Sequence, residues 1–200
     1  MPKVVDHSNR RKELLPAVWK VTARDGVENV TLRAIAAETG WSTGTLQHYF
    51  PNKRELIVSA HELAYSRAGE RIADRVRELK GVAALRAVLL EALPLDDERL
   101  LEARVEVSAW NLAATDEDFR AMRKERVDQW LALLEQLIAD SRKETGAGGD
   151  RSDAIAAHQA LMLIDALSAQ AVVTPHIATP ERQRELVEIF LAEAVGASQR

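Results

Sequence analysis

The sequence predicts an all-α fold of about nine helices, with a three-helix head at the N-terminus followed by a helical bundle. Three observations support this prediction. Apolar residues recur at helical spacing along most of the chain, no segment alternates convincingly between apolar and polar residues, and turn residues separate the helical stretches. We expect the head to comprise residues 1–56 and the bundle residues 57–200.

The expected helices follow one another with short connections. They cover residues 9–25, 31–39, 43–50, 53–79, 82–92, 97–114, 117–143, 152–173 and 181–196. The turn signals are Gly81, the region of Pro94, Thr115 with Asp116, the GAGGD sequence at 146–150, and Thr174 with Pro175. The GAGGD sequence lacks the Lys-Ser/Thr pair of a P-loop and follows no strand, so we interpret it as a flexible linker.

The first expected helix has one apolar face, which would support the two short helices after it. That face holds Leu14, Ala17, Val18 and Val21. The two short helices have a capping or turn signal at every boundary. These signals are the N-cap Thr31, the turn glycine Gly40, the N-cap Ser42, the stop at Pro51, and the capping pair Asn52 and Glu55 around Lys53. Glycine accepts the left-handed conformation that a sharp turn between two helices requires.

The second short helix has a definite outer face. Leu46 and Phe50, four residues apart, form its inward apolar stripe. At about 100° per residue, the opposite side presents Gly44, Thr45, Gln47 and His48. Two helices joined by a glycine turn, with the second exposed, are typical of the helix-turn-helix that reads DNA. We therefore expect these four residues to face bases.

The same stretch resembles the signature of TetR-type transcriptional regulators. The matching residues are Gly40, Trp41, Ser42, Thr43, Gly44, Thr45, Leu46, Gln47, His48, Tyr49, Phe50, Lys53 and Leu56, with the elements G-x-S-x-G-T-L and Y-F-x-x-K. The resemblance, together with the exposed face, gives the expected DNA-binding set Thr31, Arg33, Ser42, Thr43, Gly44, Thr45, Gln47, His48, Tyr49 and Lys53. By this resemblance Tyr49 and Lys53 would grip phosphates.

Two positions depart from the family pattern. Gln47 stands where an aromatic residue is common, and Trp41 stands where a small aliphatic residue is common. The operator sequence therefore cannot be carried over from the family. The C-terminal half resembles the choline-responsive repressors of this family, without a distinct motif.

The charge of the chain is unevenly distributed. Residues 1–56 carry nine Lys and Arg against six Asp and Glu, a balance of +3, whereas residues 57–200 carry eighteen against twenty-five, a balance of −7. Phosphate attraction is screened beyond about 10 Å, so the local charge of the head matters more than the total of −4. Arg10, Arg11 and Lys12 alone would be a solvated charge run; beside a helix-turn-helix we interpret them as phosphate contacts.

The composition excludes several classes of protein. The chain has no cysteine, which removes disulfides, thiolate zinc sites and cysteine nucleophiles and suits a reducing cytoplasm. The first residues contain no apolar signal core, and no segment approaches eighteen uninterrupted apolar residues. We therefore expect a cytoplasmic protein with no membrane partner.

The helix at 97–114 is apolar on two faces, which predicts a central position. Its polar residues, Glu102, Arg104, Glu106 and Asn111, are either surface residues and satisfied ion pairs or the lining of a ligand cavity. Tryptophans at helical spacing are usually core residues, but we hypothesise a pocket wall that consists of Trp110, Trp130, His158 and Met162. Because indole faces attract cations, a cationic or aromatic organic effector is favoured over an anion.

The last two expected helices, 152–173 and 181–196, carry broad apolar faces. These faces would either be buried within one chain or pack on a second copy, and the family resemblance favours a homodimer through both helices.

The sequence gives no catalytic or metal-binding pattern. His61 and Glu62 lack the second histidine of an H-E-x-x-H motif, no G-x-S-x-G elbow occurs, and His158 and Asp165 have no nucleophile on their face. We therefore expect no enzyme, no metal and no cofactor. The prediction is a ligand-responsive DNA-binding regulator, a repressor that binds a palindromic double-stranded operator as a dimer. The alternative is an all-helical small-molecule binding or catalytic protein without a DNA role.

Overall fold

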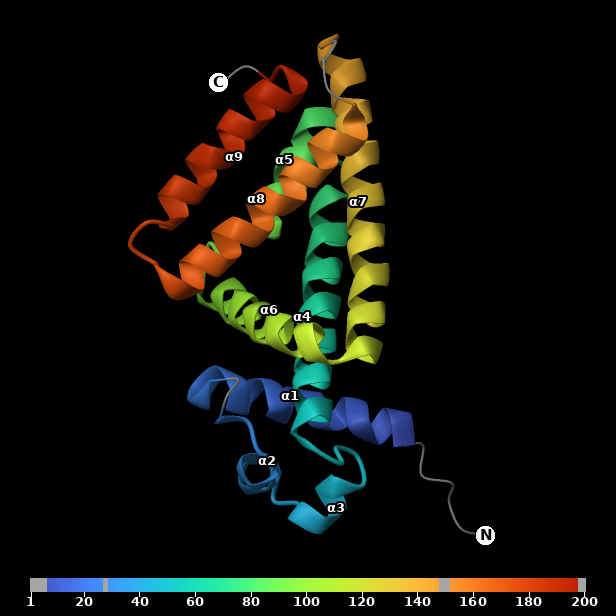
Figure 1. The fold of residues 1–200 in the computed structure, drawn as a ribbon, viewed down its shortest axis with the longest axis vertical. Coiled ribbons are helices and arrows are strands. Elements are labelled where there is room, and N and C mark those ends of the chain that lie inside the picture. The colour runs from blue at the N-terminus through green and yellow to red at the C-terminus, as the bar shows by residue number, and fades with distance from the viewer. Residues whose placement is uncertain (1–6, 27–28, 148–151, 198–200) are drawn as a thin grey trace.

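The computed structural model describes residues 7–26, 29–147 and 152–197 (Figure 1). These residues contain nine helices and no strand, which confirms the all-α prediction. The helices are α1 (His7–Asp25), α2 (Leu32–Thr39), α3 (Thr43–Gln47), α4 (Lys53–Val76), α5 (Gly81–Glu91), α6 (Asp97–Thr115), α7 (Glu117–Thr145), α8 (Asp153–Val173) and α9 (Pro180–Val195). The expected boundaries extend α3 and α4 three residues too far; residues 148–150 of the GAGGD sequence lie outside the described residues.

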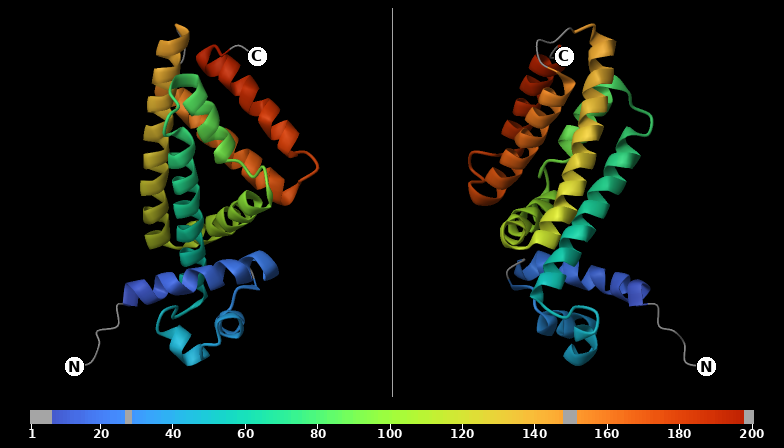
Figure 2. Two further views of the ribbon diagram at one scale, coloured as in Figure 1. Left: turned by 180° about the vertical axis from the view of Figure 1, so that it is seen from behind. Right: turned by 45° about the vertical axis from the view of Figure 1, so that its right-hand side comes forward.

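The head and the bundle occupy opposite ends of the molecule. Helices α2 and α3 lie at one end beyond α1, and α4 runs from them into the bundle of α5 to α9 (Figures 1 and 2). The buried cluster of the head includes Leu14, Val18, Ile35, Leu46 and Phe50, and it extends to Leu101 and Val105 of α6. The head is therefore packed against α6 as well as joined to α4.

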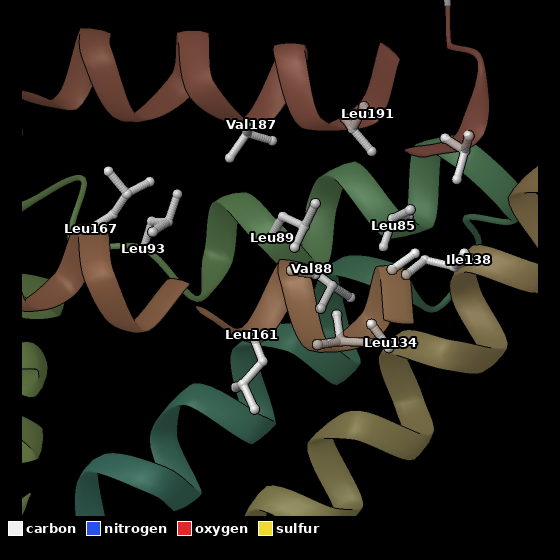
Figure 3. Packing of buried hydrophobic residues seen from close by; sticks show 14 of the residues in the cluster. Leu85, Val88, Leu89, Leu93, Leu134, Ile138, Leu161, Leu167, Val187 and Leu191 are labelled. Atoms are coloured by element: carbon white, nitrogen blue, oxygen red, sulfur yellow. The ribbon is translucent and has the colours of Figure 1, made fainter. Parts of the chain in front are cut away.

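The core of the bundle lies between α5, α7, α8 and α9 (Figure 3). Its labelled members include Leu85, Leu89, Leu134, Ile138, Leu161 and Leu191. Each fully buried leucine or isoleucine contributes about 1.5 to 3 kcal/mol by leaving water. Leu191 of α9 is completely buried within the protomer. Part of the apolar face of α9 is therefore covered by its own chain.

Helix α8 is long and apolar enough to cross a membrane by length and composition alone. Within the bundle, 39% of its apolar window is buried. Its buried residues include Ala156, Ala160, Leu161, Leu167 and Ala171. Small residues at three of these positions permit close packing against neighbouring helices.

Candidate functional site

The helix-turn-helix has the caps that the sequence predicts. Thr31 accepts a hydrogen bond from Ala34 N at 3.1 Å, and Ser42 accepts one from Thr45 N at 3.0 Å. Gly40 has φ of 73° and donates its backbone N–H to the carbonyl oxygen of Ala36 at 2.9 Å. Asn52 caps the start of α4 in the same way. These caps fix the angle at which α3 leaves α2.

Helix α3 presents a polar outer face. Leu46 and the following Phe50 are fully buried, and Phe50 N still donates to Leu46 O at 2.9 Å although α3 ends at Gln47. The exposed residues of the expected DNA-binding set are Thr31, Arg33, Ser42, Thr43, Gly44, Thr45, Gln47, His48 and Lys53. Tyr49 is half-buried and packs edge-on against Trp41, with ring centroids 5.8 Å apart. The arrangement can therefore offer one continuous polar surface to a groove of DNA.

The three basic residues at 10–12 do not form one exposed group, which corrects their interpretation as phosphate contacts. Arg11 donates to Glu55 Oε2 at 3.0 Å and to Ser59 Oγ at 2.7 Å, and its guanidinium lies over the ring of Phe50. Arg11 therefore fastens α1 to α4. Arg10 pairs with Glu13 at 2.7 Å, and Lys12 is exposed.

A cavity of about 150 Å³ lies among α4, α6, α7 and α8. Its wall consists of His61, Ala64, Tyr65, Ala68, Ala92, Arg99, Glu102, Ala103, Glu106, Arg123, Arg126, Val127, Trp130, Leu161, Ile164, Asp165 and Ser168. The wall combines aliphatic and aromatic side chains with ionisable ones, and apolar surface with placed polar groups is typical of small-molecule sites. Of the four polar residues of α6, Glu102 and Glu106 line the cavity and also form ion pairs, whereas Arg104 and Asn111 are exposed outside it.

A polar network joins three helices along one side of the cavity. Buried His61 of α4 contacts Glu106 Oε2 of α6 through Nε2 at 2.7 Å, and Arg126 of α7 contacts its Nδ1 at 2.6 Å. A guanidinium can only donate, so Nδ1 is the acceptor and Nε2–H donates to Glu106. Arg123 completes the network with an ion pair to Glu106.

Two carboxyl groups of the cavity have opposite pKa shifts. Burial alone would raise the pKa of Glu106, but the hydrogen bond from His61 and the ion pair with Arg123 lower it to about 2. Burial raises the pKa of Asp165 to about 6; the charge of Arg123 opposes this shift and that of Glu106 adds to it. One acid is therefore firmly ionised, whereas the other changes charge near neutral pH.

Only part of the hypothesised pocket wall is brought together. Trp130 lines the cavity. Trp110 lies outside the lining and donates Nε1–H to Glu106 at 2.9 Å. His158 and Met162 are exposed, and this corrects their assignment to the wall. They lie one turn apart on one face of α8, while another face, with Leu161, Ile164, Asp165 and Ser168, meets the cavity.

Sequence reasoning missed several cavity residues, namely His61, Tyr65, Arg123, Arg126 and Asp165. A signal for one of them was present. Leu161, Asp165 and Ser168 are spaced as i, i+4 and i+7, which places them on one helical face. Within the described residues, no group of three or more His, Cys, Asp or Glu side chains could hold a metal ion.

Comparison with known proteins accounts for both ends of the chain. Residues 14–60 match the family model for bacterial regulatory proteins of the tetR family, and residues 81–196 match that for the C-terminal part of BetI-type transcriptional repressors. The transcriptional regulator PksA of Bacillus subtilis is 30% identical over 94% of this chain and 90% of its own length. BetI of Cronobacter sakazakii is 27% identical over 99% of this chain and 96% of its own length.

Solved structures share the same fold. A transcriptional regulator from Rhodococcus is 25% identical, with a TM-score of 0.79 over 93% of this chain and 96% of its own. A regulator from Saccharomonospora viridis was solved in complex with choline. It is 22% identical, with a TM-score of 0.84 over 94% of this chain and 98% of its own. All four are named as transcriptional regulators. The chain therefore belongs to the TetR family of transcriptional regulators and has a C-terminal domain of the BetI type.

Proposed function

We propose that this regulator is a cytoplasmic repressor that binds a palindromic operator as a homodimer and is released by a small organic effector. In this proposal residues 1–56 form the DNA-binding domain and residues 57–200 the effector-binding and dimerisation domain. The supporting observation is the path of α4. It begins at Lys53 beside α3 and carries His61 and Tyr65 of the cavity wall, about 12 to 18 Å further along at 1.5 Å per residue. An effector in the cavity thus touches the helix that carries the head.

The effector in this proposal is a small organic cation. A cavity of about 150 Å³ suits a molecule with about six to eight non-hydrogen atoms, since benzene fills one of similar volume. Trp130 supplies aromatic surface of the kind that attracts cations, and the neighbouring Tyr65 already holds the guanidinium of Arg126 over its ring, 4.6 Å from the centroid. Among the relatives, a Paenarthrobacter nicotinovorans repressor, 33% identical over about half the chain, is nicotine-responsive, and the S. viridis regulator holds choline. Choline is a cation, and nicotine carries a basic nitrogen.

The proposed dimer interface uses the outer faces of α8 and α9. Ile155 and Met162 of α8 are 53% and 55% exposed, and Ile189 of α9 is 39% exposed. Large apolar side chains gathered on two neighbouring helices favour a second copy as their cover. Elsewhere on α9 the exposed residues are polar, among them Arg182, Arg184 and Glu185.

DNA reading is tested by selecting an operator in vitro and measuring its affinity for variants. Gln47→Ala should cost about 1 to 3 kcal/mol and relax the preference at one base position of each half-site, because a glutamine amide pairs bidentately with adenine. Lys53→Ala should weaken all sequences similarly and reduce the salt dependence by about one unit per half-site. Equal affinity of the wild-type protein for selected and scrambled DNA would contradict the proposal.

A further inference from the structure

The carboxylates that line the cavity differ in how they are satisfied. Glu102 accepts two hydrogen bonds from Arg71, at 2.8 and 2.6 Å. Glu106 is held by His61, Trp110 and Arg123. In the part of the chain that the structure describes, Asp165 has neither a hydrogen bond nor an ion pair. The acids of α6 are thus paired directly with protein groups, whereas the acid from α8 has only the more distant charge of Arg123 to offset its own.

The surroundings of Asp165 make its charge costly in the empty cavity. It shares the cavity wall with the apolar side chains of Leu161 and Ile164, which are poor substitutes for water, and the charges that act on it are those of Arg123 and Glu106. Its raised pKa is consistent with this location. A cation placed in the cavity would offset that cost, because an opposite charge within about 4 to 6 Å favours the ionised carboxylate.

We propose that Asp165 is the specificity-determining residue of the cavity, the carboxylate that selects a positively charged nitrogen over a neutral or anionic group of the same shape. This inference rests on the proposed effector-binding function and assigns its selectivity to one side chain. Trp130 and Tyr65 would contact the apolar part of the ligand, and the acids of α6 would remain in their ion pairs.

Binding of a permanent cation would then be linked to pH. The other titratable groups around the cavity are His61 and Tyr65 from α4, Arg99, Glu102 and Glu106 from α6, and Arg123 and Arg126 from α7. Glu106 stays ionised in this range because its pKa is about 2. At pH 5 about a tenth of a carboxyl group with a pKa of about 6 is ionised. Affinity for a cation should therefore fall about tenfold between pH 8 and pH 5.

The test is calorimetric titration of the full-length protein with three probes of one shape. They are choline, its uncharged isostere in which carbon replaces nitrogen, and the carboxylate that corresponds to this uncharged isostere. Wild-type protein at pH 8 should bind choline at least about tenfold more tightly than the uncharged isostere. Asp165→Asn should lose both this preference and the pH dependence of the choline affinity. Asp165→Glu, which keeps a carboxylate, should retain part of both. Asp140→Asn, which removes an exposed charge from the far end of α7, serves as the matched control and should behave as wild type.

Several outcomes would overturn the assignment. It fails if Asp165→Asn retains the preference for choline while folded, as judged by its circular dichroism, or if the carboxylate probe binds best, which would point to Arg126. It also fails if wild-type protein binds no choline at millimolar concentration. In each case selective operator binding, measured separately, shows whether the proposed DNA-binding function still stands.

Discussion

Gly81 shows how one residue can depend on a distant part of the chain. It begins α5 with φ of 50°, and a Cβ added there would overlap the carboxylate of Glu144. That carboxylate accepts a hydrogen bond from Val82 N at 3.0 Å, while Lys80 at the N-cap position makes no side-chain cap. The end of α7 therefore caps the start of α5, and the positive φ of residue 81 favours glycine there.

Replacing Gly81 with alanine should destabilise the protein. Gly81→Ala should lower the free energy of unfolding by about 1 to 2 kcal/mol, because the left-handed conformation is unfavourable for alanine and its Cβ would displace Glu144. Gly69→Ala is the matched control. Gly69 lies within α4 with no atom within 4 Å of an added Cβ, so alanine should raise the free energy of unfolding by about 0.5 to 1 kcal/mol. Urea titration measures both, and unchanged stability of Gly81→Ala would contradict the role of this cap.

At the scale of helices, Glu106 holds α6 to both α4 and α7 through His61 and Arg123. Its pKa is about 2 in the folded protein against 4.5 ordinarily. The ionised carboxylate therefore stabilises the fold fully above pH 4.5, and this contribution is lost as the pH falls towards 2. The helices around the cavity should separate more easily in acid.

Glu106→Gln should lower the free energy of unfolding at pH 7 and flatten its decline between pH 4.5 and pH 2. Glu98→Gln provides the control on the same helix, because the Glu98 side chain is 56% exposed and its partner among the described residues is Arg67, across the surface. It should change neither quantity appreciably. Urea unfolding at a series of pH values gives both slopes, and identical slopes for wild type and Glu106→Gln would refute the contribution of this network.

A second link between helices lies close to the head. Arg54, in the first turn of α4, forms an ion pair with Asp116, with Nη2 to Oδ1 at 3.0 Å. Asp116 also caps α7 by accepting from Phe119 N at 2.8 Å. The start of α4 is thus tied to the junction of α6 and α7, which places the head in contact with the elements that line the cavity.

For the whole molecule, the proposed mechanism depends on the separation of two heads in a dimer. Half-sites about 34 Å apart, or a multiple of that distance, tolerate little error in this separation. An effector that binds more tightly to a conformation with a different separation of the heads would shift the population away from the DNA-binding state. The cavity and the head need only share α4 and α6 for this to occur.

The proposed dimer predicts the effect of a charge on the outer face of α8. Met162→Glu should release monomers, since an unpaired charge would be buried at the interface. Leu133→Glu adds the same charge at a 40% exposed position of α7 and should leave the dimer intact. Light scattering at micromolar concentration distinguishes the two, and a wild-type monomer would contradict the dimer. A charge at Leu191 is unsuitable, because that residue belongs to the core of the protomer.

The sequence by itself determined the local geometry of the head. Thr31, Gly40, Ser42 and Asn52 act within three or four residues, so their caps and the resulting angles could be predicted without knowledge of any other element. The inward direction of Leu46 also follows from helical periodicity alone.

Only the tertiary structure decided which side chains meet at the cavity. Helix α8 is apolar on several faces, so periodicity could not show that Asp165 meets the cavity while Met162 faces outward. Arg11 belongs to a basic run in the sequence, but its partners Glu55 and Ser59 lie more than forty residues away, and no local pattern indicates them. Such contacts depend on how helices rotate and pack against one another, and that is set by the summed burial of many residues rather than by any local pattern.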